Sequence, residues 1–242
     1  MTSGSVKVWW LETGPLPEPR HTGLWENLGH DETRKASAFL FEAGRRDYIY
    51  AHTLKRFALS ICFGAPFHRW QFKAGSSGKP HVSAPQLPGS IDFNLTHTKG
   101  FVAVAVSVSG AVGIDAETRK RPLLQDDLVA RFCTPSELEH LACLATDQAA
   151  HHEMVLRLWT RKEAFAKAMG LGLALPFTSL DALRPDATLA ASCPLTHSVR
   201  EGWVTDLEVP APFLLAVAKR GPETAPRIHV HTPSFDELLS VL

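Results

Sequence analysis

The feature that most restricts how this chain folds is a run of valine and alanine near its middle, at residues 101–108. A strand without polar alternation is expected to be buried on both faces of its sheet. The wider apolar stretch, 101–114, is interrupted by two serines and two glycines. It is too short and too broken to cross a bilayer. The run therefore predicts a sheet inside a packed domain.

A similar run returns late in the chain. Residues 213–218 resemble residues 101–106, and each run follows a helical region and a loop. The length of 242 residues allows one large domain or two small ones. The repeat permits two similar α+β halves that divide near Ser109. We therefore expect an N-terminal half at 1–109 and a C-terminal half at 110–242.

Charge and cysteine content exclude some classes of protein. The chain has 25 Lys+Arg and 25 Asp+Glu. This balance argues against a dedicated nucleic-acid binder but allows a local basic patch for a phosphorylated ligand. No cysteine pair has Cys-x-x-Cys spacing, so neither a thiolate zinc site nor a redox dithiol is indicated. The four are Cys62, Cys133, Cys143 and Cys193. The first residues have no signal-peptide pattern, and we expect a soluble, cytoplasmic protein.

Hydrophobic spacing and turn residues predict the other elements. Strands are expected at 6–11, 69–73, 91–95, 101–108, 111–117, 177–183, 202–207 and 213–219. The tight turn at Ser109 and Gly110 suggests that 101–108 and 111–117 form an antiparallel hairpin. Helices are expected at 31–60 with a break near Gly44, at 123–132, at 134 onward, at 152–169 and at 235–242. Thr134 and Glu137 form a capping box, and Gly170 suits a C-cap.

Two carboxylates are the first candidate site. Asp115 and Glu117 are two residues apart on an expected strand, so their side chains point the same way. Adjacent carboxylates repel each other unless a cation or a proton lies between them. Oxygen ligands of this type suit Mg²⁺. The alternative is a pair of carboxylates on a solvated strand face.

The expected helix at 152–169 carries the second candidate. Glu163 and Lys167 are four residues apart and project together from the edge of its apolar face. Taken alone, this element is better explained by an ordinary helix-stabilising Glu–Lys pair, because such pairs are common. Lys162 lies within the apolar stripe, so it needs a polar partner or must extend its amine to water.

Basic and histidine side chains are the third candidate. His97 ends an expected strand after Thr96, and Lys79 belongs to a turn-rich loop, so these groups can bind phosphate. The alternative for His97 is a partly buried histidine with a satisfied hydrogen bond. The expected helical region at 31–60 has a basic side that can also bind phosphate. A solvated helix face is the alternative interpretation of this side. Its residues are Arg34, Lys35, Arg45, Arg46, Lys55 and Arg56.

The order of these motifs resembles that of the 4′-phosphopantetheinyl transferases. It runs Gly-Lys-Pro, Phe-Asn-Leu-Thr-His, Gly-Ile-Asp-Ala-Glu and Trp-x-x-Lys-Glu-Ala-x-x-Lys-x-x-Gly-x-Gly-Leu. The length is similar to that of the large, monomeric group of the family, typified by the surfactin-synthetase activating enzyme. The resemblance covers residues 31–183. Thr96 stands where the family often has serine, and it keeps the hydroxyl group.

The resemblance implies an α+β fold of two α/β halves with pseudo-two-fold symmetry, each with a small antiparallel sheet and a long helix. It implies transfer of the 4′-phosphopantetheine group of coenzyme A to a serine of an apo acyl or peptidyl carrier protein. The other product is adenosine 3′,5′-bisphosphate. A cytoplasmic monomer is implied, with no nucleic-acid or membrane partner.

The resemblance also implies roles for individual residues. Asp115, Glu117 and Glu163 would hold Mg²⁺, with Mn²⁺ as an alternative ion. Glu163 would also be the base for the serine, and Lys167 would contact the pyrophosphate. The nucleotide phosphates would be bound by Lys79, Thr96, His97 and either Arg45 or Arg46.

A silent binding module and a Mg²⁺-dependent phosphohydrolase are the competing functions. The segment 119–124 is expected to dock the carrier protein, through the charges of Arg119, Lys120 and Arg121 and the apolar contacts of Leu123 and Leu124. A solvated loop with its leucines turned into the core is the alternative.

Overall fold

The computed structural model describes residues 4–14, 20–75, 78–87, 89, 91–192, 199–221 and 225–240. The chain divides into two compact units. The first unit is Met1–Ser109 with Arg227–Leu242, and the second unit is Gly110–Pro226. The sequence led us to expect residues 227–242 in the second half. They belong to the first unit, because a late strand pairs with the first strand of the chain.

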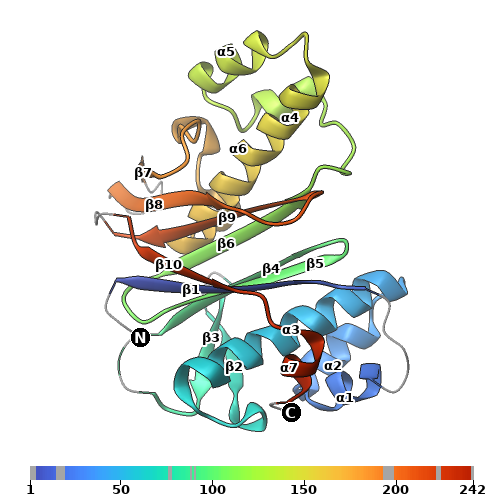
Figure 1. Ribbon diagram of the computed structural model, residues 1–242. Helices are drawn as coiled ribbons and strands as arrows, with labels where there is room; N and C mark the ends of the chain where they lie inside the picture. Colours follow the sequence, from blue (N-terminus) through green and yellow to red (C-terminus); the bar gives the residue numbers. More distant parts are fainter. Residues whose placement is uncertain are drawn as a thin grey trace. The chain divides into compact units, whose positions relative to one another are not determined.

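A four-stranded sheet in the order β10-β1-β5-β4 forms the first unit. Its strands are β1 (Ser5–Glu12), β4 (Asp92–Thr98), β5 (Phe101–Ser107) and β10 (Arg227–His231). β10 is parallel to β1, and the other neighbours are antiparallel. Figure 1 shows β1 and β10, from opposite ends of the chain, side by side. The valine-alanine run forms β5, and all of its residues are buried, as predicted.

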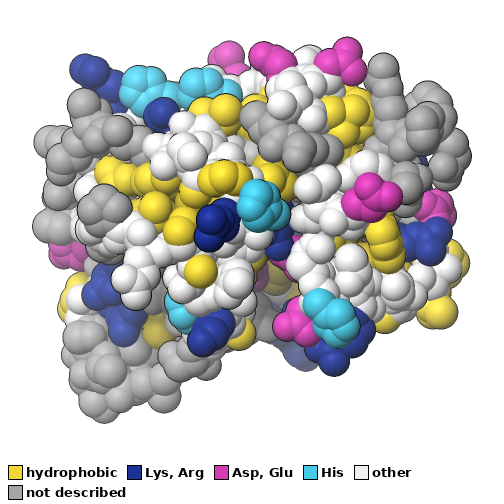
Figure 2. All heavy atoms as spheres, turned by 90° about the horizontal axis from the view of Figure 1, so that it is seen from below, with side chains coloured by type: hydrophobic (Ala, Val, Ile, Leu, Met, Phe, Trp, Pro, Cys, Tyr) yellow, Lys and Arg dark blue, Asp and Glu magenta, His cyan; other side chains and the backbone are white. Residues whose placement is uncertain are grey.

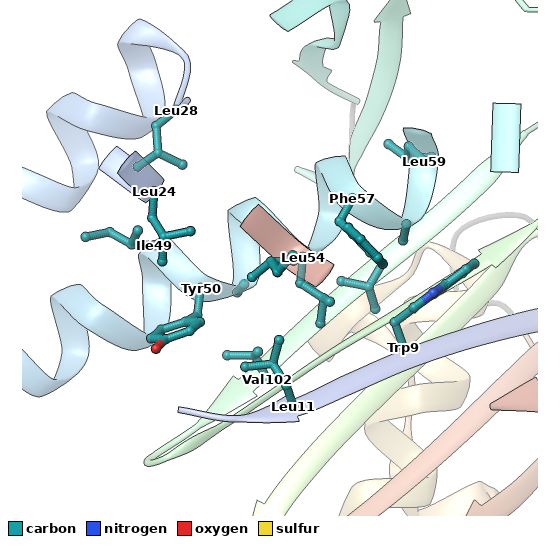
Figure 3. Close-up of a cluster of buried hydrophobic side chains, with 14 of the residues drawn as sticks. Trp9, Leu11, Leu24, Leu28, Ile49, Tyr50, Leu54, Phe57, Leu59 and Val102 are labelled. Carbon is teal, nitrogen blue, oxygen red and sulfur yellow. The ribbon is translucent and has the colours of Figure 1, made fainter. Parts of the chain in front are cut away.

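Helix α3 (Glu42–Phe63) packs on this sheet. Apolar side chains of α3, β1 and β5 meet in one core (Figure 3). They include Trp9, Leu11, Ile49, Leu54, Phe57 and Val102. The smaller elements are α1 (Arg20–Glu26), α2 (His30–Ser37), the 3₁₀ turn η1 (Phe67–Arg69), the hairpin of β2 (Gln71–Ala74) and β3 (Pro80–Ala84), and α7 (Phe235–Leu239).

The second unit also has one long helix on a four-stranded sheet. Its strand order is β6-β9-β8-β7, and all neighbours are antiparallel. The strands are β6 (Val112–Thr118), β7 (Ala187–Ser192), β8 (Val199–Leu207) and β9 (Phe213–Arg220). Helix α6 (Gln148–Met169) packs on β6, β8 and β9. The smaller elements are α4 (Asp126–Ala130), α5 (Pro135–Cys143) and the 3₁₀ turns η2 (Gly172–Ala174) and η3 (Phe177–Ser179).

Several local predictions are confirmed. Thr134 Oγ1 accepts a hydrogen bond from the Glu137 backbone N–H. The Glu137 carboxylate accepts one from the Thr134 backbone N–H, which completes the capping box at the start of α5. Gly170 ends α6 in the left-handed region, with φ 68°. Glycine takes this conformation without strain because it has no Cβ. The mixed α+β class with small, mostly antiparallel sheets is confirmed as well.

Other local predictions are wrong. Strands β5 and β6 do not form a hairpin, because β1 and β4 occupy both edges of β5 while β6 pairs with β9. The helical break lies at residues 38–41, and Gly44 is inside α3. Residues 177–183 contain η3 instead of a strand, and 123–132 contains only the short α4. Strands β3, β7 and β10 were not predicted.

No helix in the described part of the chain is long and apolar enough to cross a membrane. Cys62, Cys133 and Cys143 are free thiols, and Cys193 lies outside the described residues.

Candidate active site

In the second unit, strand β6 and helix α6 approach each other closely at Gly113. A methyl carbon at this position would lie 2.5 Å from the backbone nitrogen of Ala168. Only glycine allows this approach, which explains the glycine in the Gly-Ile-Asp-Ala-Glu motif. Residues two apart on a strand point the same way, so Asp115 and Glu117 share the side of β6 that faces α6. The close approach therefore brings their carboxylates toward the helix.

Asp115 is paired with a lysine from α6. It is 7% exposed, and Lys167 Nζ donates to its Oδ1 over 2.6 Å. The same amine lies 3.3 Å from the carbonyl oxygen of Ile114. A Glu–Lys pair within the helix was one interpretation of the sequence. In the structure the amine of Lys167 makes its ion pair with the strand.

Glu163 differs from the other two carboxylates. Its side chain makes no hydrogen bond or ion pair among the described residues. Burial raises the pKa of Glu163, the charge of Asp115 raises it further, and Lys167 partly opposes this effect. A carboxylate with a raised pKa and no counter-ion of its own is a good proton acceptor.

Glu117 has its own cation. Arg121 makes an ion pair with it from the turn that follows β6. Burial raises the pKa of Glu117, Arg121 lowers it, and Asp115 raises it. The guanidinium carbon of Arg121 also lies 5.9 Å from the centre of the Trp159 ring. Arg121 thus links the Asp-Ala-Glu motif to the tryptophan of the helix motif.

The donor chemistry of the three carboxylates suits a hard divalent cation such as Mg²⁺. Their mutual influence on the Glu163 pKa places them within electrostatic reach of one another. However, the described residues contain no group of three ligating side chains gathered closely enough to hold a metal ion. Two of the three carboxylates are paired with Lys167 and Arg121 instead. The donor set of three carboxylates therefore fits a hard divalent cation.

Lys162 is part of the scaffold. It is fully buried, and its amine pairs with the buried carboxylate of Glu137. The amine also donates to the carbonyl oxygens of Phe132, over 2.7 Å, and Phe177, over 3.0 Å. This confirms that a lysine in the apolar stripe needs a partner. The pair ties α6 to α5, and the two carbonyl contacts tie it to the turn after α4 and to η3.

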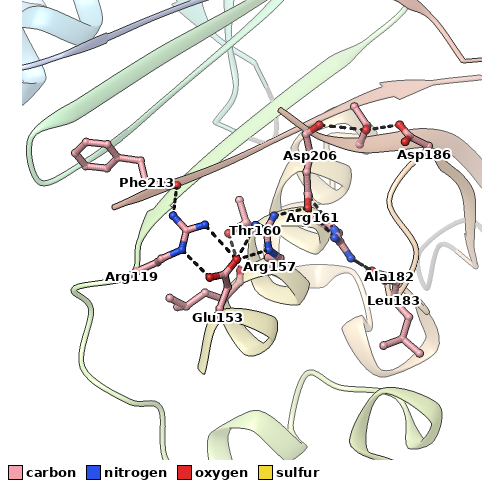
Figure 4. Close-up of polar contacts among 12 residues, drawn as sticks. Arg119, Glu153, Arg157, Thr160, Arg161, Ala182, Leu183, Asp186, Asp206 and Phe213 are labelled. Atoms are coloured by element: carbon pink, nitrogen blue, oxygen red, sulfur yellow. Dashed lines mark hydrogen bonds and ion pairs between the residues drawn. The ribbon is translucent and has the colours of Figure 1, made fainter. Parts of the chain in front are cut away.

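A second polar network fixes α6 to the sheet, and the sequence analysis missed it (Figure 4). Arg119 donates to Glu153 over 2.8 Å and to the carbonyl oxygen of Phe213 over 3.0 Å. Arg157 bridges Glu153 and Asp206, each over 2.7 Å. Charge alternation along α6 was the only signal for this network, because its partners on other elements are distant in sequence.

The first unit contains a pocket of about 920 Å³ beside the start of α3. Aliphatic and aromatic side chains form most of its wall, and three basic side chains join them. The lining residues are Lys35, Ala38, Phe39, Leu40, Phe41, Ala43, Gly44, Asp47, Tyr48, His97 and Lys99. Such a lining suits a ligand that has a flat apolar body and negative charge.

Not all of the predicted phosphate-binding residues line this pocket. His97 lines it, whereas Thr96 alternates to the other face of β4 and is 6% exposed. Lys79 is paired with Asp92, and Arg45 with Glu42. Arg46 lies 3.8 Å from Asp47. None of these three cations is among the lining residues.

Lys99 lines the pocket but was missed by the sequence analysis. It is two residues beyond His97, and strand alternation was the available signal. Lys99 and Gly100 form the turn between β4 and β5. Asp47 holds this turn, because it accepts hydrogen bonds from the Thr13 hydroxyl and, over 3.2 Å, from the backbone N–H of Gly100.

The basic side of the helical region is not a solvated face throughout. Lys55 and Arg56 are buried and both pair with Glu32 on α2. Lys55 also lies 3.6 Å from the centre of the Phe72 ring. On the face drawn in Figure 2, basic and acidic side chains are interspersed among the described residues.

Comparison with known proteins decides the family. The sequence model of the 4′-phosphopantetheinyl transferase superfamily matches residues 111–209. The 4′-phosphopantetheinyl transferase HetI of a Nostoc species is 31% identical over 176 residues, which are 72% of each chain. This chain belongs to the 4′-phosphopantetheinyl transferase superfamily. The transferase Sfp of Bacillus subtilis is 26% identical over 226 residues, covering 93% of this chain and 96% of Sfp. The transferase AcpT of Escherichia coli is 32% identical over 141 residues, covering 58% of this chain and 67% of AcpT.

The predicted enzyme class is therefore confirmed, and the chain is a transferase of the Sfp-type group. The stretch that matches the superfamily lies within the second unit. It contains Asp115, Glu117, Glu163 and Lys167. The match to Sfp extends over most of the transferase, including residues of the first unit.

Proposed function

We propose that this transferase moves the 4′-phosphopantetheine group of coenzyme A to a serine of an apo acyl or peptidyl carrier protein. Adenosine 3′,5′-bisphosphate is the other product. The observation that carries this proposal is the unpaired Glu163 carboxylate beside Asp115 and Lys167, on the stretch that matches the superfamily. A base, a cation and a carboxylate at one place suit displacement at phosphorus.

Asp115, Glu117 and Glu163 would hold Mg²⁺, with Mn²⁺ as the alternative. When bound, the ion supplies positive charge for the phosphoryl group under attack and for the leaving phosphate. The raised pKa of Glu163 supports the choice of this residue as a ligand and a base, since two neighbouring carboxylates disfavour its charge unless a cation is present.

Glu163 accepts the proton of the carrier serine, directly or through a water molecule. Its place on α6, which the Lys162–Glu137 pair anchors, keeps its carboxylate in a fixed position. Lys167 contacts the pyrophosphate and favours departure of the nucleotide phosphate. To do so its amine must give up part of its contact with Asp115, from which it now lies 2.6 Å away.

The first unit supplies the coenzyme-binding groups in this proposal. The pocket beside α3 takes the nucleotide end, with His97 on a phosphate and the aromatic wall against the base. Lys79, Thr96 and either Arg45 or Arg46 are further phosphate contacts implied by the family resemblance. Arginine is well suited to the 3′-phosphate because it makes two parallel hydrogen bonds.

The pseudo-two-fold relation of the two units also remains part of the proposal. It is supported by the shared plan of a long helix on a four-stranded sheet in each unit. We further propose that the transferase acts as a cytoplasmic monomer without a nucleic-acid or membrane partner.

Mass spectrometry of an apo carrier protein incubated with coenzyme A, Mg²⁺ and the transferase tests the function. A mass gain of one phosphopantetheine on the carrier supports transfer. Breakdown of coenzyme A without labelling identifies a phosphohydrolase, and no reaction at all identifies a binding module. Glu163→Gln is the matched control, because it preserves the shape of the side chain but removes the base.

A further inference from the structure

Arg121 has no role in the proposed reaction, yet it makes the ion pair of Glu117. The side chain of Glu117 is 13% exposed and that of Arg121 is 35% exposed. A carboxylate this far from water needs a counter-charge, and among the described residues Arg121 is the cation paired with it. Arg121 pairs with Oε1 of Glu117, and a metal ion at Glu117 would draw on the negative charge of the same carboxylate.

Two contacts hold the backbone at Arg121, whereas its long side chain is 35% exposed. The Arg121 N–H donates to the carbonyl oxygen of Thr118 over 2.9 Å, which closes the turn after β6. His152 Nε2 lies 3.0 Å from the carbonyl oxygen of Arg121. The guanidinium can therefore leave Glu117 by side-chain rotation alone.

Besides the ion pair, the side chain has a second favourable contact in the same position. The guanidinium carbon lies 5.9 Å from the Trp159 ring centre, and an arginine over an indole ring gains a cation–π attraction.

We propose that Arg121 is a built-in counter-ion of Glu117, which the divalent cation displaces, so that Arg121 sets the metal affinity of the transferase. This inference rests on the metal site of the proposed function. Arg121 and Lys167 are each paired with one of the three carboxylates proposed for that site.

Titration with Mn²⁺, followed by the electron paramagnetic resonance signal of the free ion, tests this inference. The transferase is titrated alone and with saturating coenzyme A, and no carrier protein is added, so no turnover occurs. We expect Arg121→Gln to bind Mn²⁺ about three- to tenfold more tightly than the unaltered protein, the size of a partly buried ion pair. Arg121→Lys keeps the charge and should stay close to the unaltered protein.

Lys120→Gln is the matched control. It removes the same charge from the same turn, but Lys120 is exposed, and we expect no more than about a twofold change from its distant charge. Equal or weaker Mn²⁺ binding by Arg121→Gln would overturn the inference while leaving the metal site in place. An unaltered protein that binds no Mn²⁺, with or without coenzyme A, would remove the metal site itself and the inference with it.

Discussion

Replacement of Gly113 by alanine is the sharpest test of how the site is built. The new methyl carbon would lie 2.5 Å from the backbone nitrogen of Ala168 and 3.0 Å from the Cβ of Lys167. It would be closer still to the carbonyl oxygen of Ala164. Two of these obstacles are backbone atoms of a long helix, so they cannot rotate away as a side chain can. Helix α6 must shift away from β6.

The size of the effect follows from this geometry. Overpacking a well-packed core costs about 1–3 kcal/mol and sometimes more. Because backbone meets backbone here, we expect about 3 kcal/mol, or a fall in Tm of roughly 6–12 °C for a chain of this size. The shift also lengthens the Lys167–Asp115 contact and moves Glu163, so the transfer rate should fall by at least about 100-fold.

Calorimetric unfolding and the carrier-labelling assay measure the two effects. Gly14→Ala is the control, because a methyl carbon there meets nothing within 4 Å. A Gly113→Ala protein with an unchanged Tm and normal labelling would show that β6 and α6 do not approach as closely as described, and the account of the site would have to be abandoned.

Four further changes test other parts of the structure. Glu163→Gln should lower kcat by about 100-fold or more but leave Tm unchanged or higher, because it relieves repulsion among carboxylates; a lower Tm in unfolding scans would contradict this. Asp47→Asn weakens the support of the turn beside the pocket and should raise KM for coenzyme A about three- to tenfold with little change in kcat; steady-state kinetics with an unchanged KM would refute it. Burial lowers the pKa of His52 from 6.5 to about 4. The unfolded chain therefore binds more protons between these values, and the first unit should lose about 3 kcal/mol as the pH falls through them; denaturant unfolding of His52→Gln should lack this loss. Lys120→Glu should raise KM for an acidic carrier protein and flatten its salt dependence without affecting coenzyme A; unaltered carrier kinetics would place docking elsewhere.

The structure describes the surroundings of the segment 119–124, which the sequence led us to expect as the docking site of the carrier protein. Arg119 is held by Glu153 and Arg121 by Glu117. Lys120 remains exposed, and Leu123 is 53% exposed. Two of the three charges are paired within the chain, so Lys120 is the one that can be changed without breaking an ion pair of Glu153 or Glu117.

Local signals predicted the parts of the fold that local chemistry determines. The buried strand β5 and the end of α6 at Gly170 follow from composition and from glycine conformation, so the sequence identifies them. The predicted hairpin through Ser109 and Gly110 is wrong for a non-local reason. A short turn permits two strands to pair, but the competition from β1 and β4 for the edges of β5 is non-local.

The same limit applies to the candidate site. Strand alternation correctly places Asp115 and Glu117 on one side of β6, but it says nothing of the cations that meet them. Lys55 and Arg56 resemble solvated helix residues until Glu32, on another helix, accounts for their burial. Pairing partners are chosen by tertiary structure, and a single sequence carries no direct record of that choice.

The parallel pairing of β10 with β1 has a consequence for synthesis on the ribosome. The second unit is one continuous segment, so all of its residues are synthesised before Arg227. The first unit must wait, because β10 and α7 come from Arg227–Leu242. Until then β1 is an open sheet edge, and Trp9 lacks the His231 ring that stacks on it at 5.1 Å. Nascent chains stalled before residue 227 should therefore be the form most prone to aggregate.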